Sequence, residues 1–465
     1  MEKRFSKFCV ASLLALSVVV PVSTVMVKNS LNSRVVANDP KADLMFPING
    51  EEVNILKPSI ADYVDAMHKQ AEPIKDDQLL HDFYVMAPDT TSRHYGETFT
   101  NETDLVRVNT FTNNSNIQKS KKVMLTFLGN GTEPNKVKIS EKIDMSDAIE
   151  ITNLEHVNDS YYVGVNQLYS GKTYYWQAFK DGTSVSDVAS FKTAQGFRMI
   201  TTNSVTNVRD MGGRTVKLKT GVDGEGNNVY VTKRIKQGLI FRGGELVEED
   251  YVPTDSSSTH HATLKTGDAE LFVEKLNIGL EIDFRGAAES GDLTESPLKS
   301  YYRKNYSEEK DINYLRLDNM SAYDDFMSIS SSKSYYPDIK NMFKAFANAN
   351  ERHVYFHCWG GADRTGTCGF LLGALLGMSL TDLIIDYELT SFSNNYRPHD
   401  SNDAKKVYRF PSLLRKVLEL NKKGKSETYW EENKPLSQII EEILIDRFEV
   451  TSEDIASIRA NLLED

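Results

Sequence analysis

Cysteine is scarce in this chain of 465 residues, which contains only Cys9, Cys358 and Cys368. Three cysteines cannot form the disulfide framework on which many small secreted domains depend. Tryptophan is also rare, with three residues, although hydrophobic residues make up 40% and aromatic residues 10% of the chain. This composition excludes wholesale disorder, a collagen-like fibre and a multi-span membrane protein, and the length suits about two to three domains.

Positive charge is the second deficit. The 54 Lys and Arg residues are outnumbered by 66 Asp and Glu residues, which gives a net charge of −12, and the basic residues form no stripe. Proteins that bind nucleic acids concentrate positive charge on one face or along one helix. The sequence therefore predicts that nucleic acid is not a partner.

The longest hydrophobic stretch is at the N-terminus, where Lys3, Arg4 and Lys7 precede an apolar run from Phe8 to Val27. A basic segment followed by an apolar one is typical of a secretory signal. We therefore expect residues 1–37 to be a signal peptide, and the mature chain to be secreted or held at the cell surface without an integral membrane span. An uncleaved anchor is the alternative, because the apolar run approaches membrane-spanning length.

Two regions of different pattern precede residue 196. Residues 38–95 are polar and are expected to form an irregular lead-in, with one helix through residues 59–64. Residues 96–195 contain short runs of β-branched and aromatic residues separated by Gly, Asn and Asp, which is typical of strands and turns. We therefore expect a β-rich domain there, which serves either as an adaptor or as a spacer.

One stretch of the β-rich region indicates its fold class. Leu168, Gly171 and Tyr174 have the spacing Leu-x-x-Gly-x-x-Tyr, which resembles the tyrosine corner of fibronectin type III-like sandwiches. In the strand that follows, Tyr174, Trp176 and Ala178 fall on one face, and we expect Trp176 to be a core residue. The resemblance implies a β-sandwich of the fibronectin III or immunoglobulin-like type.

Over residues 196–465, short strand patterns alternate with longer helical patterns. Such alternation predicts an α/β domain with a mostly parallel central sheet flanked by helices. The C-terminal end predicts two helices, with a cap at Thr451 between them. The expected strands are 239–242, 280–284, 312–317 and 353–357, and the expected helices are 267–276, 336–349, 365–378 and 380–389.

The residues suited to chemistry concentrate in one strand–loop–helix segment. A buried strand ends at His357, a loop runs from Cys358 to Asp363, and an apolar helix begins at Arg364. Gly360 and Gly361 let the loop turn so that its N–H groups converge, and the start of the helix adds partial positive charge. These features predict an anion site suited to phosphate. The residues expected to contact the substrate are Trp359, Gly360, Gly361, Ala362 and Arg364.

A cysteine at the start of such a loop is placed for covalent catalysis. The positive field favours the thiolate of Cys358, which would attack phosphorus and form a cysteinyl-phosphate. Arg364 presents a planar fork that matches two phosphate oxygens, and Thr365 could hydrogen-bond the thiolate as it leaves. His357 is expected to orient the loop, Cys368 is expected to be a core residue, and we predict no metal or other cofactor.

The arrangement His-Cys-x5-Arg-Thr-Gly at residues 357–366 resembles the signature of the cysteine-dependent protein tyrosine phosphatase superfamily. Residues 207–213, Asn-Val-Arg-Asp-Met-Gly-Gly, resemble a motif of bacterial tyrosine phosphatases whose loop reads His-Cys-x-x-Gly-x-Asp-Arg-Thr-Gly. The resemblance covers residues 197–465, with shorter matches at 241–244, 282–285, 386–389 and 450–455.

The resemblance implies a tyrosine phosphatase-like fold and a secreted or surface enzyme of a bacterium that acts on phosphotyrosine-containing proteins or peptides. Some members of the group also act on phosphoserine, phosphothreonine or phosphoinositides, so the resemblance leaves room for dual or lipid specificity. It further implies that Arg209 and Asp210 brace the site without touching the substrate. No residue between Cys358 and Arg364 is Lys or Arg, and removal of residues 1–37 would leave a net charge of −16. Both features disfavour highly phosphorylated lipids and inositols as substrates.

The leaving oxygen needs a proton, and two aspartates compete to supply it. Asp363 lies in the loop beside Arg364, where the related bacterial enzymes carry an aspartate suggested to act as the acid. Asp318 follows a candidate strand, in a place comparable to the separate acid loop of other superfamily members, but it could instead form a turn with Asn319. Both stay candidates, with Asp363 preferred.

Two other functions fit parts of the pattern. A non-catalytic, adhesive surface module could use the same loop to bind phosphorylated partners, but such a module has no need of the Cys358 thiol. Rhodanese-like sulfur transferases also place a cysteine at the start of an anion-binding loop. The run Arg364-Thr365-Gly366 at this spacing fits phosphate chemistry better.

Overall fold

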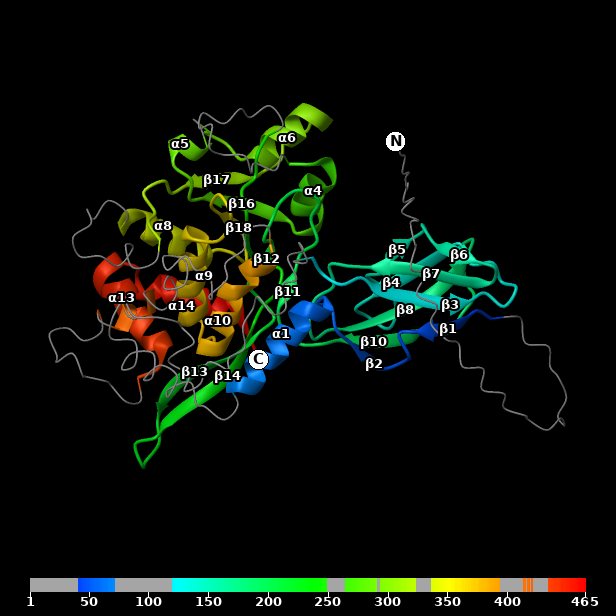
Figure 1. The fold of residues 1–465 in the computed structure, drawn as a ribbon, viewed down its shortest axis with the longest axis horizontal. Helices are drawn as coiled ribbons and strands as arrows, with labels where there is room; N and C mark the ends of the chain where they lie inside the picture. Colours follow the sequence, from blue (N-terminus) through cyan, green and yellow to red (C-terminus); the bar gives the residue numbers. More distant parts are fainter. Residues whose placement is uncertain are drawn as a thin grey trace, which may run out of the picture. The chain divides into compact units, whose positions relative to one another are not determined.

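The computed structural model describes most of the chain after residue 40 (Figure 1). The expected signal peptide at residues 1–37 and the end of the lead-in at residues 72–95 lie outside the described residues. The described residues are 41–71, 119–248, 264–290, 293–322, 336–393, 413–414, 416–418, 420 and 434–465.

Two sheets form the β-rich region. The first has the order β1-β3-β7-β6, and the second has the order β2-β10-β8-β4-β5, with β9 paired to β8. All pairings are antiparallel except that of β10 with β2. The strands are β1 (Asp43–Phe46), β2 (Glu51–Val53), β3 (Val123–Leu128), β4 (Lys136–Ser140), β5 (Ile149–Ile151), β6 (Glu155–Val157), β7 (Ser160–Val165), β8 (Thr173–Lys180), β9 (Thr183–Ser184) and β10 (Ala189–Thr193).

The two sheets share one hydrophobic cluster. Phe127 of β3 and Trp176 of β8 come from different sheets, and their ring centroids lie 6.1 Å apart. Tyr174, Trp176 and Ala178 are all buried, which confirms that they share the inner face of β8. Trp176 is fully buried, as expected of a core residue. The assignment of this region to the fibronectin III or immunoglobulin type stays a prediction.

The residues expected to form an irregular lead-in contribute regular structure. Strand β1 belongs to the first sheet and β2 to the second. The helix expected near residue 60 is present as α1 (Pro58–Ala71). The β-rich region therefore begins well before residue 96, because strands that pair with distant partners need no strong local pattern of their own.

The central sheet of the C-terminal region has the order β11-β12-β15-β18-β16-β17. Strands β15, β18, β16 and β17 run parallel, but β11 pairs antiparallel with β12, and β12 with β15. The expectation of a mostly parallel sheet is therefore wrong, and the sheet is mixed. Its strands are β11 (Arg198–Met199), β12 (Arg209–Asp210), β15 (Ile240–Gly243), β16 (Ile278–Asp283), β17 (Asn313–Arg316) and β18 (His353–His357).

Connection length explains the antiparallel pairing of β11 with β12. A parallel crossover needs about a dozen residues or more, usually including a helix. Residues 200–208 between β11 and β12 are too few for one. Between β12 and β15 the chain forms the hairpin of β13 (Thr215–Val222) and β14 (Asn228–Ile235), which pairs with the short C-terminal strand β19 (Leu463–Glu464).

Helices pack on both faces of the central sheet. Alternate residues of β18 point to opposite faces, so Val354 and Phe356 join one hydrophobic cluster whereas Tyr355 joins another. The first cluster includes α8 (Tyr336–Ala347), α9 (Arg364–Leu375), α10 (Leu380–Glu388), η3 (Leu389–Phe392), α13 (Leu436–Phe448) and α14 (Ser452–Leu462). The second includes α4 (Thr266–Glu270), η1 (Leu271–Lys275) and α6 (Pro297–Tyr306). The short helix α5 (Ala287–Ser290) follows β16.

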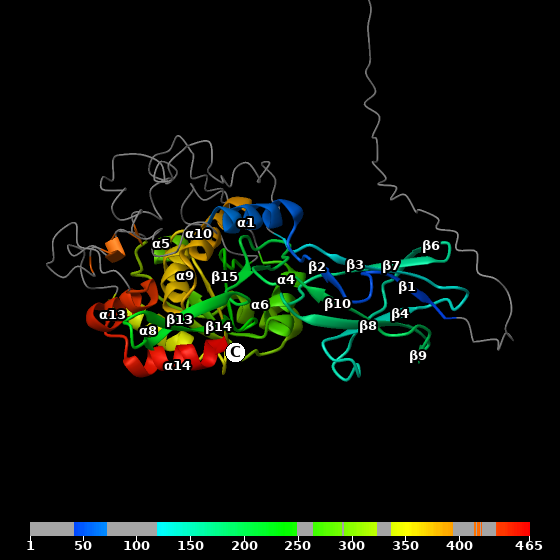
Figure 2. The same cartoon turned by 90° about the horizontal axis from the view of Figure 1, so that it is seen from below.

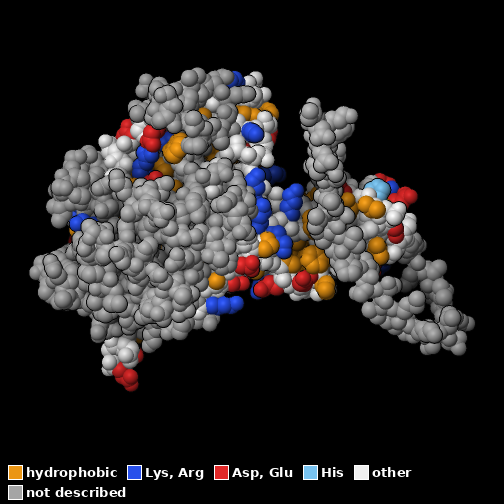
Figure 3. All heavy atoms as spheres, viewed as in Figure 1, with side chains coloured by type: hydrophobic (Ala, Val, Ile, Leu, Met, Phe, Trp, Pro, Cys, Tyr) orange, Lys and Arg blue, Asp and Glu red, His pale blue; other side chains and the backbone are white. Residues whose placement is uncertain are grey.

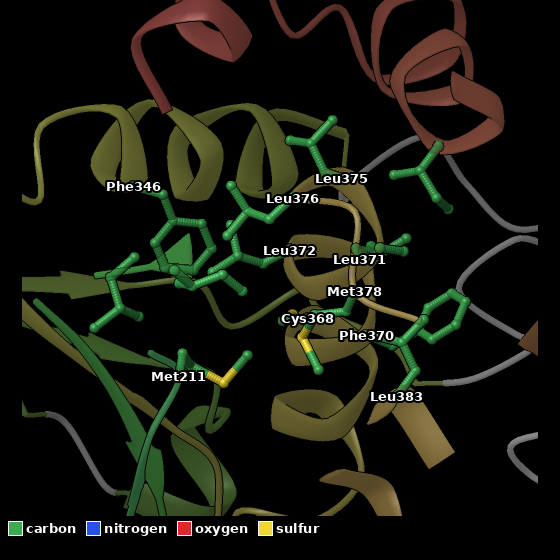
Figure 4. Close-up of a cluster of buried hydrophobic side chains, with 14 of the residues drawn as sticks. Met211, Phe346, Cys368, Phe370, Leu371, Leu372, Leu375, Leu376, Met378 and Leu383 are labelled. Atoms are coloured by element: carbon green, nitrogen blue, oxygen red, sulfur yellow. The ribbon is translucent and has the colours of Figure 1, made fainter. Parts of the chain in front are cut away.

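Helix α9 is almost entirely enclosed. Every residue after Arg364 in this helix is buried, and its apolar side chains meet those of α8 and α10 in one cluster (Figure 4). Cys368 is fully buried there, which confirms it as a core residue. The two predicted C-terminal helices are present as α13 and α14, and the Thr451 hydroxyl accepts the Asp454 N–H at 3.0 Å, which confirms the cap.

The face of the molecule drawn in Figure 3 carries charges of both signs on its described residues. Several hydrophobic side chains are exposed on the β-rich region, namely Met45, Phe46, Ile48, Ile143, Ile149, Val157 and Val188. Within the described part of the chain, no helix is long and apolar enough to cross a membrane.

The tyrosine-corner spacing generates a testable prediction. The Tyr174 hydroxyl accepts the Tyr169 N–H at 2.8 Å. Tyr174→Phe keeps the ring but leaves that donor unpaired, so we expect the free energy of unfolding to fall by about 1–3 kcal/mol. Chemical denaturation followed by tryptophan fluorescence measures the change. An unaltered midpoint would mean that water replaces the hydroxyl and that the corner does not stabilise the fold.

Candidate active site

The strand–loop–helix segment lies at the edge where the parallel strands end. Strand β18 ends at His357, α9 begins at Arg364, and residues 358–363 connect them. Strands β15, β16 and β17 end at the same edge, because they run parallel to β18. Cys358 is 2% exposed, at the first position of the loop. Ligands of open α/β sheets bind at such an edge.

The loop is held from one side through its carbonyl groups. The Asn207 side-chain amide donates to the carbonyl oxygens of Gly360 and Gly361 at 3.2 and 3.0 Å, and Arg242 donates to that of Gly361 at 3.0 Å. In a planar trans peptide the N–H points opposite to the C=O. The N–H groups of Gly361 and Ala362 are therefore directed away from Asn207, where they can meet an anion.

Gly361 is the glycine that this loop requires. Its φ is +66°, in the left-handed region that favours glycine. A Cβ atom at this position would lie 2.2 Å from the carbonyl oxygen of Gly243. Gly360, which was expected to let the loop turn in the same way, does not have a positive φ.

A buried cluster of charges fixes the two groups that hold the loop. Asp386 of α10 accepts from Arg209 Nε at 2.8 Å and from Arg242 Nη1 at 2.5 Å. Arg209 also donates to the Asn207 side-chain oxygen at 2.6 Å. Burial opposes the charge of Asp386, but the two guanidinium groups outweigh it and lower its pKa. Removing one member of such a buried set leaves an unpaired charge and costs about 3–5 kcal/mol.

The structure separates the two residues that were expected to brace the site together. Arg209 reaches the loop through Asn207. The Asp210 carboxylate instead accepts from Arg198 at 2.8 Å and from the N–H groups of Gly212 and Gly238, each at 2.7 Å. Arg198 also donates to carbonyl groups of the β-rich region at Gln167 and Leu168. Asp210 therefore holds the turns around β12 and not the loop.

His357 lies beneath the loop within a second buried polar cluster. Its Nε2 is 2.9 Å from Glu281 Oε1, and its Nδ1 is 3.3 Å from the Cys358 carbonyl oxygen. Asp283 accepts three hydrogen bonds from the Arg285 guanidinium and one from the Tyr314 hydroxyl. Burial opposes the charge of Asp283, but His357 and Arg285 lower its pKa to about 2. This position suits the expected role of His357 in orienting the loop.

This second cluster has the spacing of a metal site, since ligand atoms of Glu281, Asp283 and His357 lie within 4.8 Å of one another. The carboxylates already have partners: Ser296 and His357 hydrogen-bond Glu281, and the Arg285 cation pairs with Asp283. A metal ion would have to displace these donors at full burial, so the donor set fits a hydrogen-bond network and not a cation.

The guanidinium of Arg364, the residue that follows the loop, is oriented by its hydrogen bonds. Its guanidinium donates to both carboxylate oxygens of Glu289 in α5, at 2.6 and 2.5 Å, and to the Phe284 carbonyl oxygen at 2.7 Å. Burial would lower the pKa of Arg364, but Glu289 and the charge at Cys358 outweigh burial and raise it. The adjacent Thr365 is fully buried, and its hydroxyl has no hydrogen-bond partner among the described residues. That unpaired hydroxyl fits the expected hydrogen bond to the thiolate.

The two acid candidates lie in different settings. Asp363 precedes α9, and its side chain is partly exposed and does not cap the helix. Asp318 is 48% exposed, accepts from the side chain of Asn319 at 3.2 Å, and lies in a turn after β17. Neighbouring strands lie about 4.8 Å apart, so β17, two strands from β18, is about 10 Å from it. Asp363, which lies in the same loop as Cys358, is therefore nearer to Cys358 than Asp318 is.

The remaining loop residues line the site differently. Trp359 is half-buried, and its carbonyl oxygen accepts the Glu245 N–H at 3.1 Å, whereas Ala362 is buried. Glu245 in turn pairs with Arg285. No role was predicted for Asn207, Arg242, Arg285 and Asp386, although they lie in segments that carry the resemblance, and Glu281 and Glu289 were missed. A glutamate four residues after Arg285 was the available signal for Glu289.

A comparison with protein-family models matches the region that contains this site. A family model described as the tyrosine phosphatase family matches residues 200–464. No curated protein matches the chain. Among solved structures, the core catalytic domain of the PP-IP phosphatase SIW14 from S. cerevisiae, crystallised with citrate, is 12% identical, with a TM-score of 0.24. That match covers 41% of this chain and 88% of the yeast domain.

The Gly361 geometry predicts a sharp loss of anion binding. In Gly361→Ala the Cβ atom would clash with a backbone carbonyl, so the loop must shift, and a shift of 1 Å can cost about 100-fold in rate. We therefore expect the rate of phosphate release from a phosphorylated substrate to fall by at least that factor. Gly279→Ala in β16 is the control, because its Cβ would meet side-chain atoms at 3.5 Å, an ordinary contact. Equal activity of the two variants would contradict the proposed loop geometry.

The buried carboxylates predict acid sensitivity. A carboxylate with a lowered pKa stabilises the fold above its unfolded pKa, and this contribution is lost as the pH falls through the folded pKa. For Asp283, with a folded pKa of about 2, the loss is about 2 kcal/mol between pH 4 and pH 2. Denaturation at a series of pH values measures it. Asp283→Asn should show a shallower slope in this window, and an equal slope would refute the assignment.

Proposed function

Because the chain belongs to the tyrosine phosphatase family, we propose that this phosphatase hydrolyses phosphotyrosine in proteins or peptides through a cysteinyl-phosphate. The observation that carries the proposal is the geometry at the end of β18. The buried thiol of Cys358 begins the loop, and the Gly361 carbonyl is hydrogen-bonded to Asn207 and Arg242. The Arg364 guanidinium, at the other end of the loop, is oriented by Glu289.

The first half of the reaction breaks the phosphate ester. The thiolate sulfur of Cys358 attacks phosphorus, the phosphorus–oxygen bond to the tyrosine breaks, and Asp363 donates a proton to the leaving oxygen. The charge spread over the phosphoryl oxygens is stabilised by the N–H groups of the loop, by Arg364 and by the start of α9. These donors are in place before substrate binds, so little reorganisation is needed.

The second half regenerates the enzyme. Asp363, now a carboxylate, takes a proton from water, the water oxygen attacks phosphorus, and the sulfur–phosphorus bond breaks. Phosphate leaves, and the Thr365 hydroxyl hydrogen-bonds the departing thiolate. Atoms and charge balance with water as the only co-reactant, so this route uses no cofactor.

The charges around the loop favour a substrate with one phosphate group. Residues 359–363 contain no Lys or Arg, and Glu289 already neutralises much of the charge of Arg364. A substrate with several phosphates would therefore be poorly matched, and phosphoinositides are the secondary class. Half-buried Trp359 offers an aromatic surface beside the loop. We further propose that residues 1–37 direct export, so that the substrates lie outside a bacterial cell or at its surface.

Replacing the nucleophile tests the reaction. Cys358→Ser should abolish phosphate release from a phosphotyrosine peptide, because serine lacks a thiolate at neutral pH. Cys368→Ala is the matched control, since this second cysteine is buried in α9 and should leave turnover nearly intact. Phosphoserine, phosphoinositide and phytate substrates rank the specificity. A well-folded wild-type protein that binds phosphotyrosine peptide but releases no phosphate would instead support a non-catalytic binding module.

The acid is tested with two substrates. Loss of a general acid costs about 100- to 10,000-fold when the leaving group is poor. Asp363→Asn should therefore slow hydrolysis of a phosphotyrosine peptide much more than that of 4-nitrophenyl phosphate, whose leaving group needs no proton. Asp318→Asn should affect both substrates equally and weakly. The opposite pattern would transfer the role of acid to Asp318.

A further inference from the structure

Helix α1 belongs to the sheet region by sequence but to the phosphatase region by packing. It lies between β2 and β3 in the chain and outside residues 200–464, which match the family. Yet Ile60, Tyr63, Val64 and Met67 are buried in the same hydrophobic cluster as Cys358 and the residues of α9 and α10. Their spacing places them on one face of the helix.

The partners of α1 are the two elements that follow α9. Helices α1 and α10 lie side by side (Figures 1 and 2). The ring of Tyr63 lies 5.7 Å from that of Phe392 in η3, and His68 Nε2 lies 2.9 Å from Asp382 Oδ1 in α10. Tyr63 is fully buried. One helix therefore packs against both α10 and η3.

Both of these elements hold the phosphate loop. Helix α10 carries Asp386, which fixes Arg242, and Arg242 donates to the Gly361 carbonyl. Segment η3 carries Thr390, whose hydroxyl oxygen accepts from the Asn207 amide at 3.2 Å. The same amide donates to the carbonyls of Gly360 and Gly361. Two short chains of contacts, one through α10 and one through η3, thus connect α1 to the carbonyl groups of Gly360 and Gly361.

We propose that α1 is a positioning element of the catalytic site, with Tyr63 as its main positioning residue. Tyr63 packs against Phe392, two residues from Thr390, and so sets where η3 presents the Thr390 hydroxyl to Asn207. The proposal rests on the proposed function, because it assigns α1 to the anion-binding loop of that site. It implies that residues 200–464 alone lack part of what shapes the loop.

The test uses the full chain and inorganic phosphate as the probe. Tyr63→Ala removes the ring, Tyr63→Leu keeps bulk without the ring, and Tyr63→Phe keeps the ring contact with Phe392. Asp62→Ala and Asp65→Ala alter the exposed face of α1 and are the matched controls. Calorimetry at a temperature well below each unfolding midpoint measures phosphate affinity. Assays with a phosphotyrosine peptide give kcat and KM separately.

We expect Tyr63→Leu and Tyr63→Ala to weaken phosphate binding at least about tenfold and to lower kcat, because a displaced loop misdirects its N–H groups. Tyr63→Phe should restore both quantities to near the wild-type values. If Tyr63→Ala does not fold, Tyr63→Leu carries the comparison. Folded Tyr63→Leu with wild-type phosphate affinity and kcat would overturn the proposal, even if its melting temperature fell, because α1 would then only stabilise the core.

The same experiment separates this inference from the proposed function. If wild type binds phosphate but releases none from peptides, hydrolysis is refuted, while the affinities of the Tyr63 variants still decide the role of α1. If wild type hydrolyses the peptide and the Tyr63 variants match it, the function stands and the inference fails.

Discussion

The site depends on the Asp386 carboxylate, which joins the two arginines that hold the phosphate loop. Arg209 and Arg242 come from neighbouring strands, and both point their charge at this one group on α10. An unpaired charge at this depth costs several kcal/mol, so the three side chains stabilise one another only when all are in place. The loop conformation is therefore coupled to the packing of α10.

Strand β18 converts this arrangement into a usable active site. Its alternating side chains join the clusters on both faces of the sheet, so the end of the strand has little freedom. His357 is hydrogen-bonded to Glu281, and the Gly361 carbonyl accepts a hydrogen bond from Asn207. Glu289 orients Arg364. The carbonyl groups of Gly360 and Gly361 accept hydrogen bonds from Asn207, whereas the Thr365 hydroxyl has no hydrogen-bond partner among the described residues. The bonded groups give rigidity, and the unpaired hydroxyl is left for the reaction.

Sequence reasoning failed where long-range pairing decides structure. Strands β11 and β12 are two residues each, too short to carry a directional pattern, and their antiparallel pairing follows from the connections between them. Residues 43–46 and 51–53 were expected to belong to an irregular lead-in, yet they form strands because partners distant in the chain complete their hydrogen bonds. Helix α1 was predicted as a helix, but no local signal showed that it packs against the phosphatase core.

The sequence alone determined the features that depend on neighbours along the chain. The β18–loop–α9 segment, the positions of Cys358 and Arg364 at its two ends, and the Thr451 cap all follow from local hydrophobic period, glycine placement and helix-start rules. Only the tertiary structure showed that Asn207, Asp386 and Glu289 complete the site. Each of them is at least 28 residues from Cys358 in the sequence. The reason is that buried charges choose partners by distance in space, and the hydrophobic packing of the whole domain sets that distance.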